Sequence, residues 1–327
     1  AIQRGKHVYC QKPLTHTIWE AREIAKAARK YKVATQMGNQ GNAGENIRLT
    51  TEWIQSGAIG AVREVHAWSN RPIWPQGVER PKDTPPVPET LNWDVWLGPA
   101  PERPYSPEYH PFKWRGFWDF GTGALGDMGC HILNWPFTAL SLDLPQSVEC
   151  LVQQGMTKES PPVKSLIAYD FPAGANNSRG PVRVYWHDGG LTPTEGLSDI
   201  PLDAKGKMPE NGTLFIGEKG KLWAEYDKAP KIVPTSRASE FSAPPKTLPR
   251  SPGHHVEFIQ ACKGSGKRAG SDFVAKACRL TEFVLLGNLA IRAGNKKIEW
   301  DAATGRAKNN PGLDKYIHRD YRPGWII

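Results

Sequence analysis

The sequence predicts an α/β unit followed by a larger α+β domain with an open, mostly antiparallel sheet. Two observations support this fold class. One strand–helix–strand run lies near the N-terminus, and several strand-like runs lie close together after residue 140. A parallel pair of strands needs a crossover helix, whereas grouped strands usually pair antiparallel. At 327 residues, the chain has room for two domains.

The N-terminal run has the features of a parallel crossover. His7–Cys10 is apolar enough for a buried strand, and Val33–Met37 is the next strand. Between them, Thr17 and Glu20 form a capping-box pattern that opens an amphipathic helix from Ile18 to about Tyr31. This run is the only unit of its kind in the sequence, and it predicts two adjacent parallel strands.

The following segment begins the second domain. A helix is predicted at about 46–56 and an alternating strand at 62–70. Residues 71–113 are rich in proline and aromatic residues, with a short helix at 93–97. Connections of this length are uncommon and usually functional, so we interpret 71–113 as a lid or substrate-pocket insertion.

The remaining strands and helices follow in two groups. Strands are predicted at 146–154, 164–172, 181–187, 213–217 and 221–226, the last two flanking a hairpin turn. Helices are predicted at 253–262 and 272–291, with a short strand at 297–300 and a polar tail at 301–327. Residues 188–212 and 227–252 have the composition of loops.

Composition excludes several classes of protein. Hydrophobic residues make up 39% of the chain, yet no run of about 18 apolar residues occurs, so no membrane span is predicted. The net charge is +9, but lysine and arginine are scattered in runs no longer than two, which argues against nucleic-acid binding. The five cysteines are widely spaced without a C-x-x-C pair, which favours buried thiols over disulfides or a zinc site.

Residues 119–135 hold the first candidate for chemistry. Asp127 and His131 are four residues apart, so they share one face of a helix that we expect to begin at Asp127. A carboxylate at a helix N-terminus is favoured by the helix dipole, and it could orient the imidazole or share its proton. The spacing alone is equally compatible with an N-terminal carboxylate beside a buried structural histidine.

The same stretch contains a dinucleotide-like pattern that we do not interpret as a cofactor loop. Gly121–Gly126 matches G-x-G-x-x-G, a fingerprint that is meaningful only after a strand and within a βαβ unit. The preceding residues 114–120 do not alternate, and no such unit follows. These glycines are therefore expected at a turn or at a close backbone approach to a ligand.

Lys12 is the second candidate. It lies where a predicted strand gives way to a helix, and Pro13 pushes it into an extended conformation and allows a cis peptide bond. Ligands of open α/β sheets bind outside the carboxyl ends of the strands. Lys12 is thus placed to meet a substrate oxygen, although a single lysine is more often simply solvated.

Together these segments resemble a known family. Gly5–Leu14, with Gln11-Lys12-Pro13, resembles the strand and E-K-P motif of the glucose–fructose oxidoreductase/inositol dehydrogenase (Gfo/Idh/MocA) family. Gly123–His131 resembles its G-G-x-x-x-D-x-G-x-H motif, and 56–60 fits the start of its second domain. The resemblance implies a Rossmann domain that binds NAD(H) or NADP(H), followed by an α/β domain that carries substrate residues and often mediates homo-oligomers.

On this resemblance, residues 1–40 are the C-terminal part of a Rossmann domain and residues 41–300 are the substrate and oligomerisation domain. The family's glycine-rich start is absent, so we expect a fragment of a longer enzyme that binds dinucleotide poorly. Gln11 replaces the motif's glutamate, which removes a charge but keeps a hydrogen-bonding amide. Lys12 and Asp127 are 127 − 12 = 115 positions apart, and the additional length corresponds to 71–113.

The resemblance also assigns roles to individual residues. Lys12, Asp127 and His131 are implied to be catalytic, with His131 as the base and Lys12 stabilising the developing alkoxide. The cofactor, NAD or NADP, is expected to contact Gln11, Lys12, Pro13 and Gln40, all at the carboxyl ends of the first two strands.

Substrate contacts are expected from residues near the second motif and from one later helix. Seven of the thirteen tryptophans fall between 68 and 135, and their flat faces suit sugar rings. No third ligand accompanies Asp127 and His131 at a suitable spacing, so no metal site is predicted. The candidate substrate residues are Arg115, Trp118, His110 and His255.

We therefore expect an NAD(P)-dependent oxidoreductase acting on a secondary hydroxyl of a sugar, glycoside or cyclitol. Two alternatives remain open at this stage. One is a redox-neutral, NAD-using glycoside hydrolase of the related type, and the other is a non-catalytic carbohydrate-binding or scaffold protein. A homo-oligomer through the second domain's sheet is expected, and the location is left open between cytoplasm and periplasm.

Overall fold

A nine-stranded sheet organises the larger part of the molecule. The computed structural model describes residues 1–174, 179–194, 197–202, 206–226 and 228–325. The strand order is β11-β10-β4-β5-β6-β3-β7-β8-β9, and only the β3–β6 pair is parallel. The predicted open, mostly antiparallel sheet is therefore confirmed. Its strands are β3 (Val62–Ser69), β4 (Ser147–Gln154), β5 (Lys164–Phe171), β6 (Val182–His187), β7 (Asn211–Gly217), β8 (Lys221–Ala224), β9 (Lys231–Val233), β10 (Ile298–Asp301) and β11 (Arg306–Ala307).

A small parallel sheet stands beside it. β1 (Val8–Gln11) pairs in parallel with β2 (Thr35–Gly38), and the crossover helix α1 (Ile18–Tyr31) connects them. The capping box forms as predicted. Glu20 N donates to Thr17 Oγ1 at 3.2 Å, and Thr17 N donates to Glu20 Oε2 at 3.0 Å.

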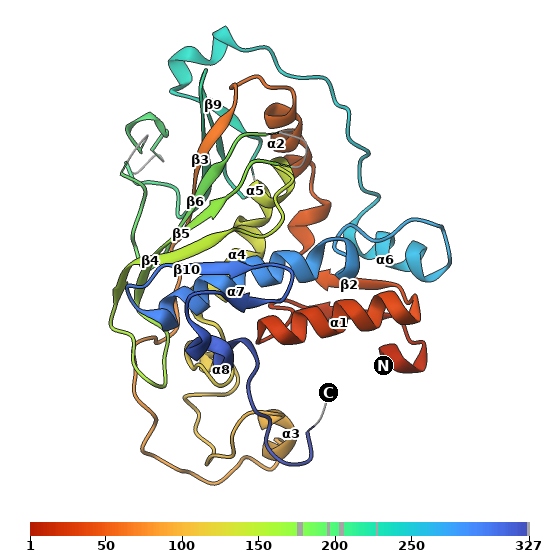
Figure 1. The fold of residues 1–327 in the computed structure, drawn as a ribbon, viewed down its shortest axis with the longest axis vertical. Helices are drawn as coiled ribbons and strands as arrows, with labels where there is room; N and C mark the ends of the chain where they lie inside the picture. The colour runs from red at the N-terminus through yellow and green to blue at the C-terminus, as the bar shows by residue number, and fades with distance from the viewer. Residues whose placement is uncertain (175–178, 195–196, 203–205, 227, 326–327) are drawn as a thin grey trace.

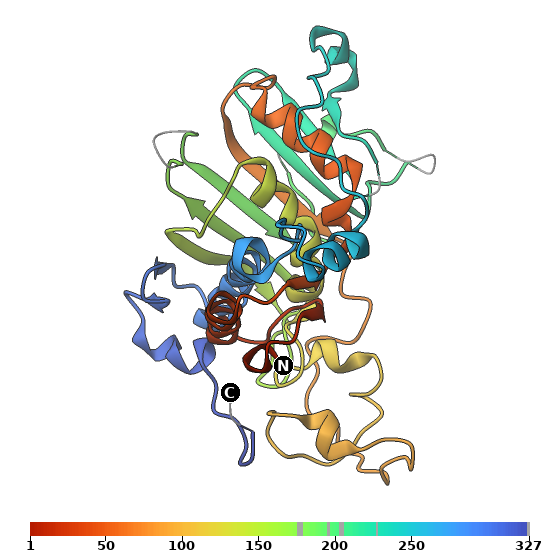
Figure 2. The same cartoon turned by 90° about the vertical axis from the view of Figure 1, so that its right-hand side faces the viewer.

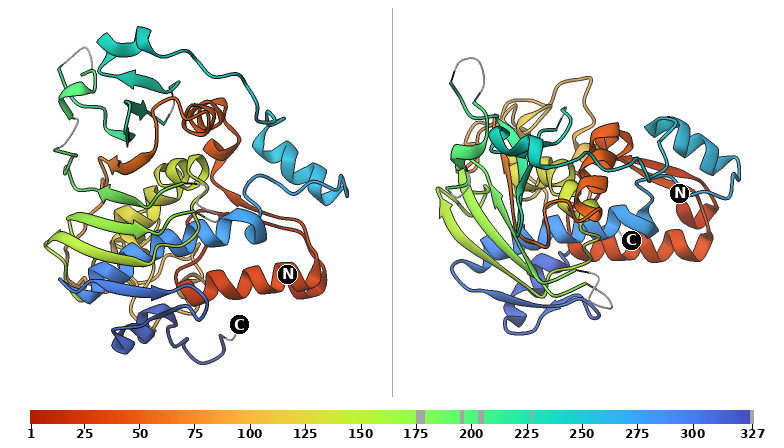
Figure 3. Two further views of the ribbon diagram at one scale, coloured as in Figure 1. Left: turned by 45° about the horizontal axis from the view of Figure 1, so that its top comes forward. Right: turned by 90° about the horizontal axis from the view of Figure 1, so that it is seen from above.

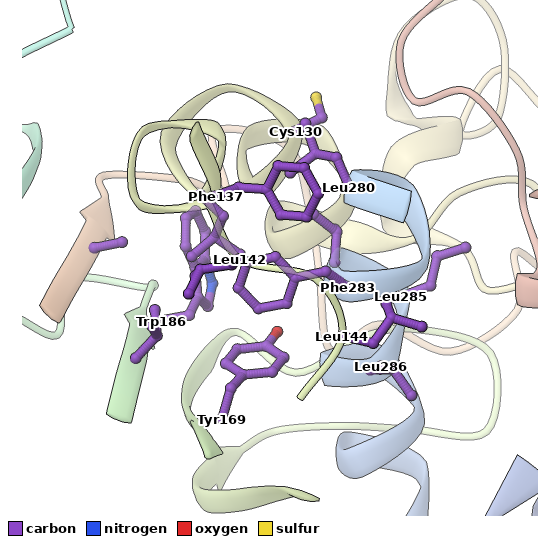
Figure 4. Packing of buried hydrophobic residues seen from close by; sticks show 14 of the residues in the cluster. Cys130, Phe137, Leu142, Leu144, Tyr169, Trp186, Leu280, Phe283, Leu285 and Leu286 are labelled. Atoms are coloured by element: carbon purple, nitrogen blue, oxygen red, sulfur yellow. The ribbon is translucent and has the colours of Figure 1, made fainter. Parts of the chain in front are cut away.

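Helices cover one face of the large sheet. In Figure 1 and in the right-hand view of Figure 3, α4, α5 and α7 lie on the side of the sheet that faces α1. Helix α7 is the centre of this layer, and Figure 4 shows Phe283 of α7 packed among aromatic side chains. Its ring meets Tyr169 and Phe171 of β5 edge-on, at centroid distances of 4.7 and 5.1 Å. The bounds are α2 (Glu45–Gln55), α4 (Gly123–Ile132), α5 (Asn134–Ala139), α6 (His254–Cys262) and α7 (Cys278–Ala293).

Helix α7 also joins the two sheets. α1 packs along it, and Arg22 Nε donates to Glu282 Oε2 at 2.9 Å. The Glu282 side chain is only 2% exposed, so this ion pair lies in a low-dielectric environment at the junction. The small sheet is thereby held in a fixed position relative to the helical layer.

The helix that carries Asp127 corrects one expectation. It begins at Gly123, not at Asp127, and it ends at Ile132 before a second helix, α5. Gly123 and Gly126 thus belong to the first turns of α4 and not to a ligand loop. A Cβ on Gly126 would collide with the Thr122 hydroxyl, so the glycine serves local packing at the helix start.

The proline- and aromatic-rich segment 71–113 lies at the end of the molecule opposite β9, as Figures 1 and 2 show. It contains the predicted short helix, α3 (Trp93–Leu97), in which Trp93 and Trp96 stack at 4.8 Å. Arg103 is buried and pairs with Asp119 and, at 3.1 Å, with Glu159. This segment is therefore an ordered unit with its own charged anchor.

Two regions that were expected to be loop or tail contain regular structure. Strand β9 lies inside the predicted loop 227–252, because it pairs with β8 and its own length of three residues gives no periodic signal. The tail includes β11 and α8 (Asp314–Ile317), which packs near α7. The predicted loop 188–212 lies partly outside the described residues. The short 3₁₀ and π turns are 2–4, 40–43, 113–116, 197–199, 235–240, 273–277 and 311–313.

No helix in the described ranges combines the length and the apolar character that crossing a membrane requires.

Candidate functional site

The carboxyl ends of β1 and β2 meet α4. Because the two strands are parallel and in register from Val8–Thr35 to Gln11–Gly38, the residues that follow them emerge at the same edge. Lys12 leaves β1 there, and the Lys12–Pro13 peptide bond is cis. Asn39, which leaves β2, donates through Nδ2 to the carbonyl of Cys130 on α4 at 3.4 Å. This contact fixes the strand ends against the helix.

Lys12 reaches Asp127 across this junction. Its Nζ lies 2.9 Å from Asp127 Oδ1 and 3.1 Å from the Asp127 carbonyl oxygen. Arg115 approaches the same Oδ1 through Nε at 3.2 Å. Two cations thus share one carboxylate whose side chain is 9% exposed. The cluster retains a net positive charge, which favours an electron-rich oxygen of a ligand.

His131 lies one helical turn after Asp127. Burial, and after it the charge of Lys12, lower the pKa of His131 to about 4, while Asp127 partly opposes the shift. The ring is therefore neutral at physiological pH. Its Nδ1 lies 3.2 Å from the hydroxyl of Tyr226, and the two rings meet edge-on at 5.6 Å. Which atom donates depends on the histidine tautomer.

The predicted direct partnership of Asp127 with His131 is not what the described residues show. The carboxylate of Asp127 is directed at Lys12 and Arg115, and the His131 ring bonds to Tyr226. Asp127 acts on the imidazole through its charge alone, because it appears among the causes of the His131 pKa shift. The i, i+4 spacing placed the two residues on one face but did not determine their partners.

Tyr226 is a site residue that sequence reasoning missed. It lies two residues after β8 ends at Ala224, whereas the predicted strand ran to 226. Gly41 makes room for it, because a Cβ at that position would lie 2.7 Å from the Tyr226 hydroxyl. No local pattern marks Tyr226, since its role comes from a contact with a residue 95 positions away.

The expected cofactor residues lie around the same edge. Gln11 is exposed and its side chain lies over Gly38, where a Cβ would collide with the amide oxygen. Gln40 is exposed at the start of the turn after β2. Lys12 and Pro13 line an open depression of about 510 Å³ together with Gln11 and Trp114. Gln11, Lys12 and Pro13 thus share one surface, whereas Gln40 lies at the end of the neighbouring strand and does not line the depression.

Of the expected substrate residues, only Arg115 joins the Lys12–Asp127 cluster. The Trp118 indole is buried and lies against the Arg292 guanidinium, 3.8 Å from the ring centroid. His110 meets Trp96 edge-on at 5.9 Å within the 71–113 segment. His255 stacks on Tyr9 of β1 at 5.6 Å. Trp118, His110 and His255 therefore contact other residues and do not join the Lys12–Asp127 cluster.

Among the described residues, no group of three or more histidine, cysteine, aspartate or glutamate side chains is arranged to hold a metal ion. The buried thiol of Cys130, next to His131, has its pKa raised to about 12 by burial. It is therefore a poor nucleophile and a poor metal ligand.

Comparison with known proteins agrees with this architecture. Residues 58–174 match the model of the C-terminal alpha/beta domain of the Gfo/Idh/MocA oxidoreductase family. The match confirms the resemblance that the two motifs predicted. A search of curated proteins by sequence gave no significant match.

Solved structures with the same fold include three that contain bound small molecules. The WlbA dehydrogenase from Bordetella pertussis, in complex with NADH and UDP-GlcNAcA, is 15% identical over 92% of this chain and 73% of its own, with a TM-score of 0.58. An inositol dehydrogenase homolog from Azotobacter vinelandii, complexed with NADH and myo-inositol, is 15% identical with the same coverage and a TM-score of 0.53. An aldose-aldose oxidoreductase from Caulobacter crescentus, complexed with glycerol, is 15% identical over 91% and 73%, with a TM-score of 0.55. At these identities the likeness establishes the fold.

Proposed function

We propose that this chain carries the catalytic residues of an NAD(P)-dependent oxidoreductase that acts on a secondary hydroxyl of a sugar, glycoside or cyclitol. The observation that carries the proposal is the meeting of Lys12 with Asp127, one helical turn before a neutral His131. Oxidation of an alcohol requires a proton acceptor and a group that stabilises negative charge on oxygen. This cluster holds both.

His131 is the proton acceptor in this scheme. A neutral imidazole has a free lone pair on one ring nitrogen, and the low pKa of about 4 keeps that lone pair available above pH 5. Tyr226 holds the other side of the ring through its contact with Nδ1. The hydroxyl proton of the substrate would pass to the nitrogen that faces the ligand.

Lys12 and Arg115 provide the charge stabilisation. The Lys12 ammonium has three N–H donors, of which two are directed at Asp127. The remaining donor and the net positive charge would lower the pKa of a bound hydroxyl and stabilise the alkoxide. Asp127 is a positioning residue, since it fixes both cations without needing to contact the substrate.

The residues present fit the nicotinamide end of the implied cofactor, NAD or NADP. The amides of Gln11 and Gln40 are exposed at the strand ends, and amides suit ribose hydroxyls. Pro13 and Lys12 border the open depression that Gln11 also lines. When bound, the cofactor would supply the hydride acceptor. In the part of the chain that the structure describes, we find groups for this end of the molecule only.

Aromatic residues beside Arg115 provide an apolar wall for a carbohydrate. The guanidinium of Arg115 lies 4.5 Å from the ring centroid of Trp114 and 4.9 Å from that of Phe112. Trp114 also lines the depression at Lys12. A sugar or cyclitol placed over Trp114 would present its hydroxyls toward Lys12.

The test is turnover with NAD or NADP on myo-inositol, glucose and a uronic acid, followed by the absorbance of the reduced nicotinamide. Lys12→Ala and His131→Ala should each lower turnover at least a hundredfold while near-native circular dichroism is retained. Lys82→Ala, at an exposed position in the 71–113 segment, is the control. Near-normal rates in either site variant would remove that residue from the mechanism.

Binding measurements keep the proposal testable if turnover is absent. NADH binding is followed by fluorescence and cyclitol binding by calorimetry, with Lys12→Met as the comparison variant. Release of an aglycone from a glycoside without net NADH formation would instead indicate the redox-neutral hydrolase. Sugar binding that is independent of NAD and unchanged in Lys12→Met would indicate the non-catalytic alternative.

A further inference from the structure

A second cavity lies between α1, α7 and α8. Its volume is about 290 Å³, which suits a molecule of monosaccharide size better than a dinucleotide. The N-cap residue of α1, Thr17, forms one edge, and Asn288 and Arg292 of α7 form the floor. His16, Thr122 and Arg319 line both this cavity and the depression at Lys12, so the two are neighbours.

The cavity has an excess of positive charge. Four cations line it: Arg292, Arg319, Lys158 and Lys315. Asp119 is the carboxylate in the lining, and its charge is already engaged by Arg103. Because the dipole of the 14-residue helix α1 adds further positive potential at Thr17, an anion would be stabilised here.

Arg292 is the best placed of these cations. Its guanidinium lies between two aromatic rings, 3.8 Å from the centroid of Trp118 and 4.9 Å from that of Tyr316. Within the described residues, no carboxylate lies within salt-bridge distance of it. Burial accordingly lowers the pKa of Arg292 to about 10. Asp119 opposes this shift through its charge but makes no ion pair with Arg292. A partly buried, preoriented cation outside any close ion pair is what an oxyanion site requires.

Glu20, the carboxylate nearest to Arg319, does not neutralise the cavity. It lies 3.9 Å from Arg319, and its oxygens already accept from the backbone N–H groups of His16 and Thr17 and from the Tyr321 hydroxyl. Arg319 itself donates to the carbonyl of Asp119 at 3.0 Å. The Arg319 guanidinium is therefore oriented mainly by a backbone carbonyl, and its contact with Glu20 is long.

Residues of the lining also contain buried polar atoms without partners. Among the described residues, Trp118 Nε1, Thr122 Oγ1 and Asn288 Oδ1 lack a hydrogen bond, although each of these residues is less than 8% exposed. Unpaired buried polar atoms are costly, and three in one wall are unusual. A ligand rich in oxygen would give them partners if these side chains turned toward it on binding.

His16 indicates that the ligand also donates hydrogen bonds. Its Nε2 lies 2.7 Å from the carbonyl oxygen of Trp118, which can only accept, so Nε2 carries the proton. Burial lowers the pKa of His16 to about 4, so the ring is neutral and Nδ1 presents a lone pair. That Nδ1 and Asn288 Oδ1 are both acceptors without a partner. Hydroxyl groups would satisfy them.

We propose that this cavity binds a polyhydroxylated acid of monosaccharide size, a sugar phosphate or a sugar acid, at a site separate from Lys12 and His131. The anionic group would lie against Arg292 and Arg319, and the hydroxyl groups would face His16 and Asn288. The proposal does not depend on the redox function, because none of these contacts involves His131 or Asp127.

Calorimetric titration of the chain tests the site with four probes: glucose 6-phosphate, gluconate, inorganic phosphate and glucose. At least one of the first two should bind at least tenfold more tightly than glucose, with an affinity that falls as salt is added. The comparison of glucose 6-phosphate with gluconate identifies the anionic group. If inorganic phosphate binds as tightly as glucose 6-phosphate, the polyhydroxylated part of the proposal is wrong.

Variants locate the binding. Arg292→Gln should weaken binding at least tenfold, and Lys158→Gln, at an exposed position on the rim, should weaken it two- to fivefold. Trp118→Phe keeps the ring under Arg292 and removes only the indole N–H, so it should also weaken binding. Arg279→Gln, on the same helix but outside the cavity, is the matched control. Lys12→Met should leave the affinity unchanged, which separates this site from the catalytic proposal.

Thermal unfolding of each variant shows whether it is folded. If Arg292→Gln does not fold, Trp118→Phe and Lys158→Gln decide the outcome. The proposal is overturned if the wild-type chain binds neither acid, or if the folded cavity variants bind as tightly as the Arg279→Gln control.

Discussion

The electrostatic state of His131 depends on one neighbouring side chain. Burial is the main cause of its low pKa, and the Lys12 ammonium is the second. Asp127 partly compensates, since a carboxylate stabilises an imidazolium. The site therefore couples the proton affinity of His131, the proposed base, to the charge of Lys12.

Removing the Lys12 charge should raise the pKa of His131. In Lys12→Met the repulsion on the imidazolium is lost while Asp127 remains, so the ring should titrate at higher pH than in the wild type. The measurement is an NMR titration of the His131 ring signals. Lys82→Met serves as the control for a distant lysine. An unchanged or lower pKa in Lys12→Met would show that the ammonium does not act on the imidazole.

At the scale of elements, glycine allows close packing between α7, α4 and β5. A Cβ on Gly287 of α7 would collide with the Tyr169 hydroxyl and lie 2.5 Å from Leu125 Cδ2. Gly129 of α4 is similarly close to Val284, where a Cβ would lie 3.0 Å from Cγ1. Because α4 carries Asp127 and His131, these close contacts fix the distance between α4 and α7 and so the position of both residues.

Gly287→Ala should lower the free energy of unfolding by about 1–3 kcal/mol, although alanine is the better helix former by about 1 kcal/mol. The neighbours are fully buried and cannot retreat, so overpacking outweighs propensity. Urea unfolding measures the effect. Gly180→Ala, where a Cβ would meet nothing within 4 Å, should be close to neutral. A stabilised Gly287→Ala would show that this contact can relax.

At the scale of the whole molecule, three histidines with lowered pKa values should make the fold sensitive to acid. Burial is the largest cause that lowers the pKa of His16 and His131 to about 4 and that of His187 to about 3. The unfolded chain takes up these protons near pH 6.5, before the folded chain does. Between about pH 6.5 and 4 these three histidines bind more protons in the unfolded state than in the folded state. Their contribution to the free energy of unfolding therefore falls as the pH falls.

The check is the urea midpoint measured from pH 7 to pH 4.5. The slope of the unfolding free energy against pH reports the number of protons taken up on unfolding. His187→Gln should lower this number by about one, because glutamine does not titrate. Lys82→Gln, which adds no titrating group in this range, should retain the wild-type slope. A midpoint that stays constant across this pH range would contradict the assignment of neutral histidines.

We also propose that the uncovered face of the large sheet forms a homo-oligomer. Helices cover one face of the large sheet. Over β4 to β6, the opposite face of the sheet carries Glu149, Arg183 and Tyr185. Leu151 of β4 is 44% exposed. Light scattering should give a mass at least twice the 36.3 kDa of one chain. Tyr185→Glu should reduce that mass and Lys308→Glu should not. A monomeric wild type would refute the proposal.

The sequence by itself determined the crossover with its capping box, the predominantly antiparallel character of the large sheet, and the two motifs that hold Lys12, Asp127 and His131. These features follow from local periodicity, capping and spacing, which a short window of residues contains. The sequence placed α4 four residues too late, because its first turns consist of glycines that look like a loop.

Only the tertiary structure decided the partners of those residues. Tyr226 beside His131, Arg115 on Asp127, and Trp118 turned away toward Arg292 all depend on contacts between distant segments, and no local pattern encodes them. The strand β9 likewise exists because β8 is available to pair with it. Side-chain burial and charge pairing are properties of the packed chain, so the proton affinity of His131 and the position of Arg292 outside any close ion pair emerge only once the helices and sheets are assembled.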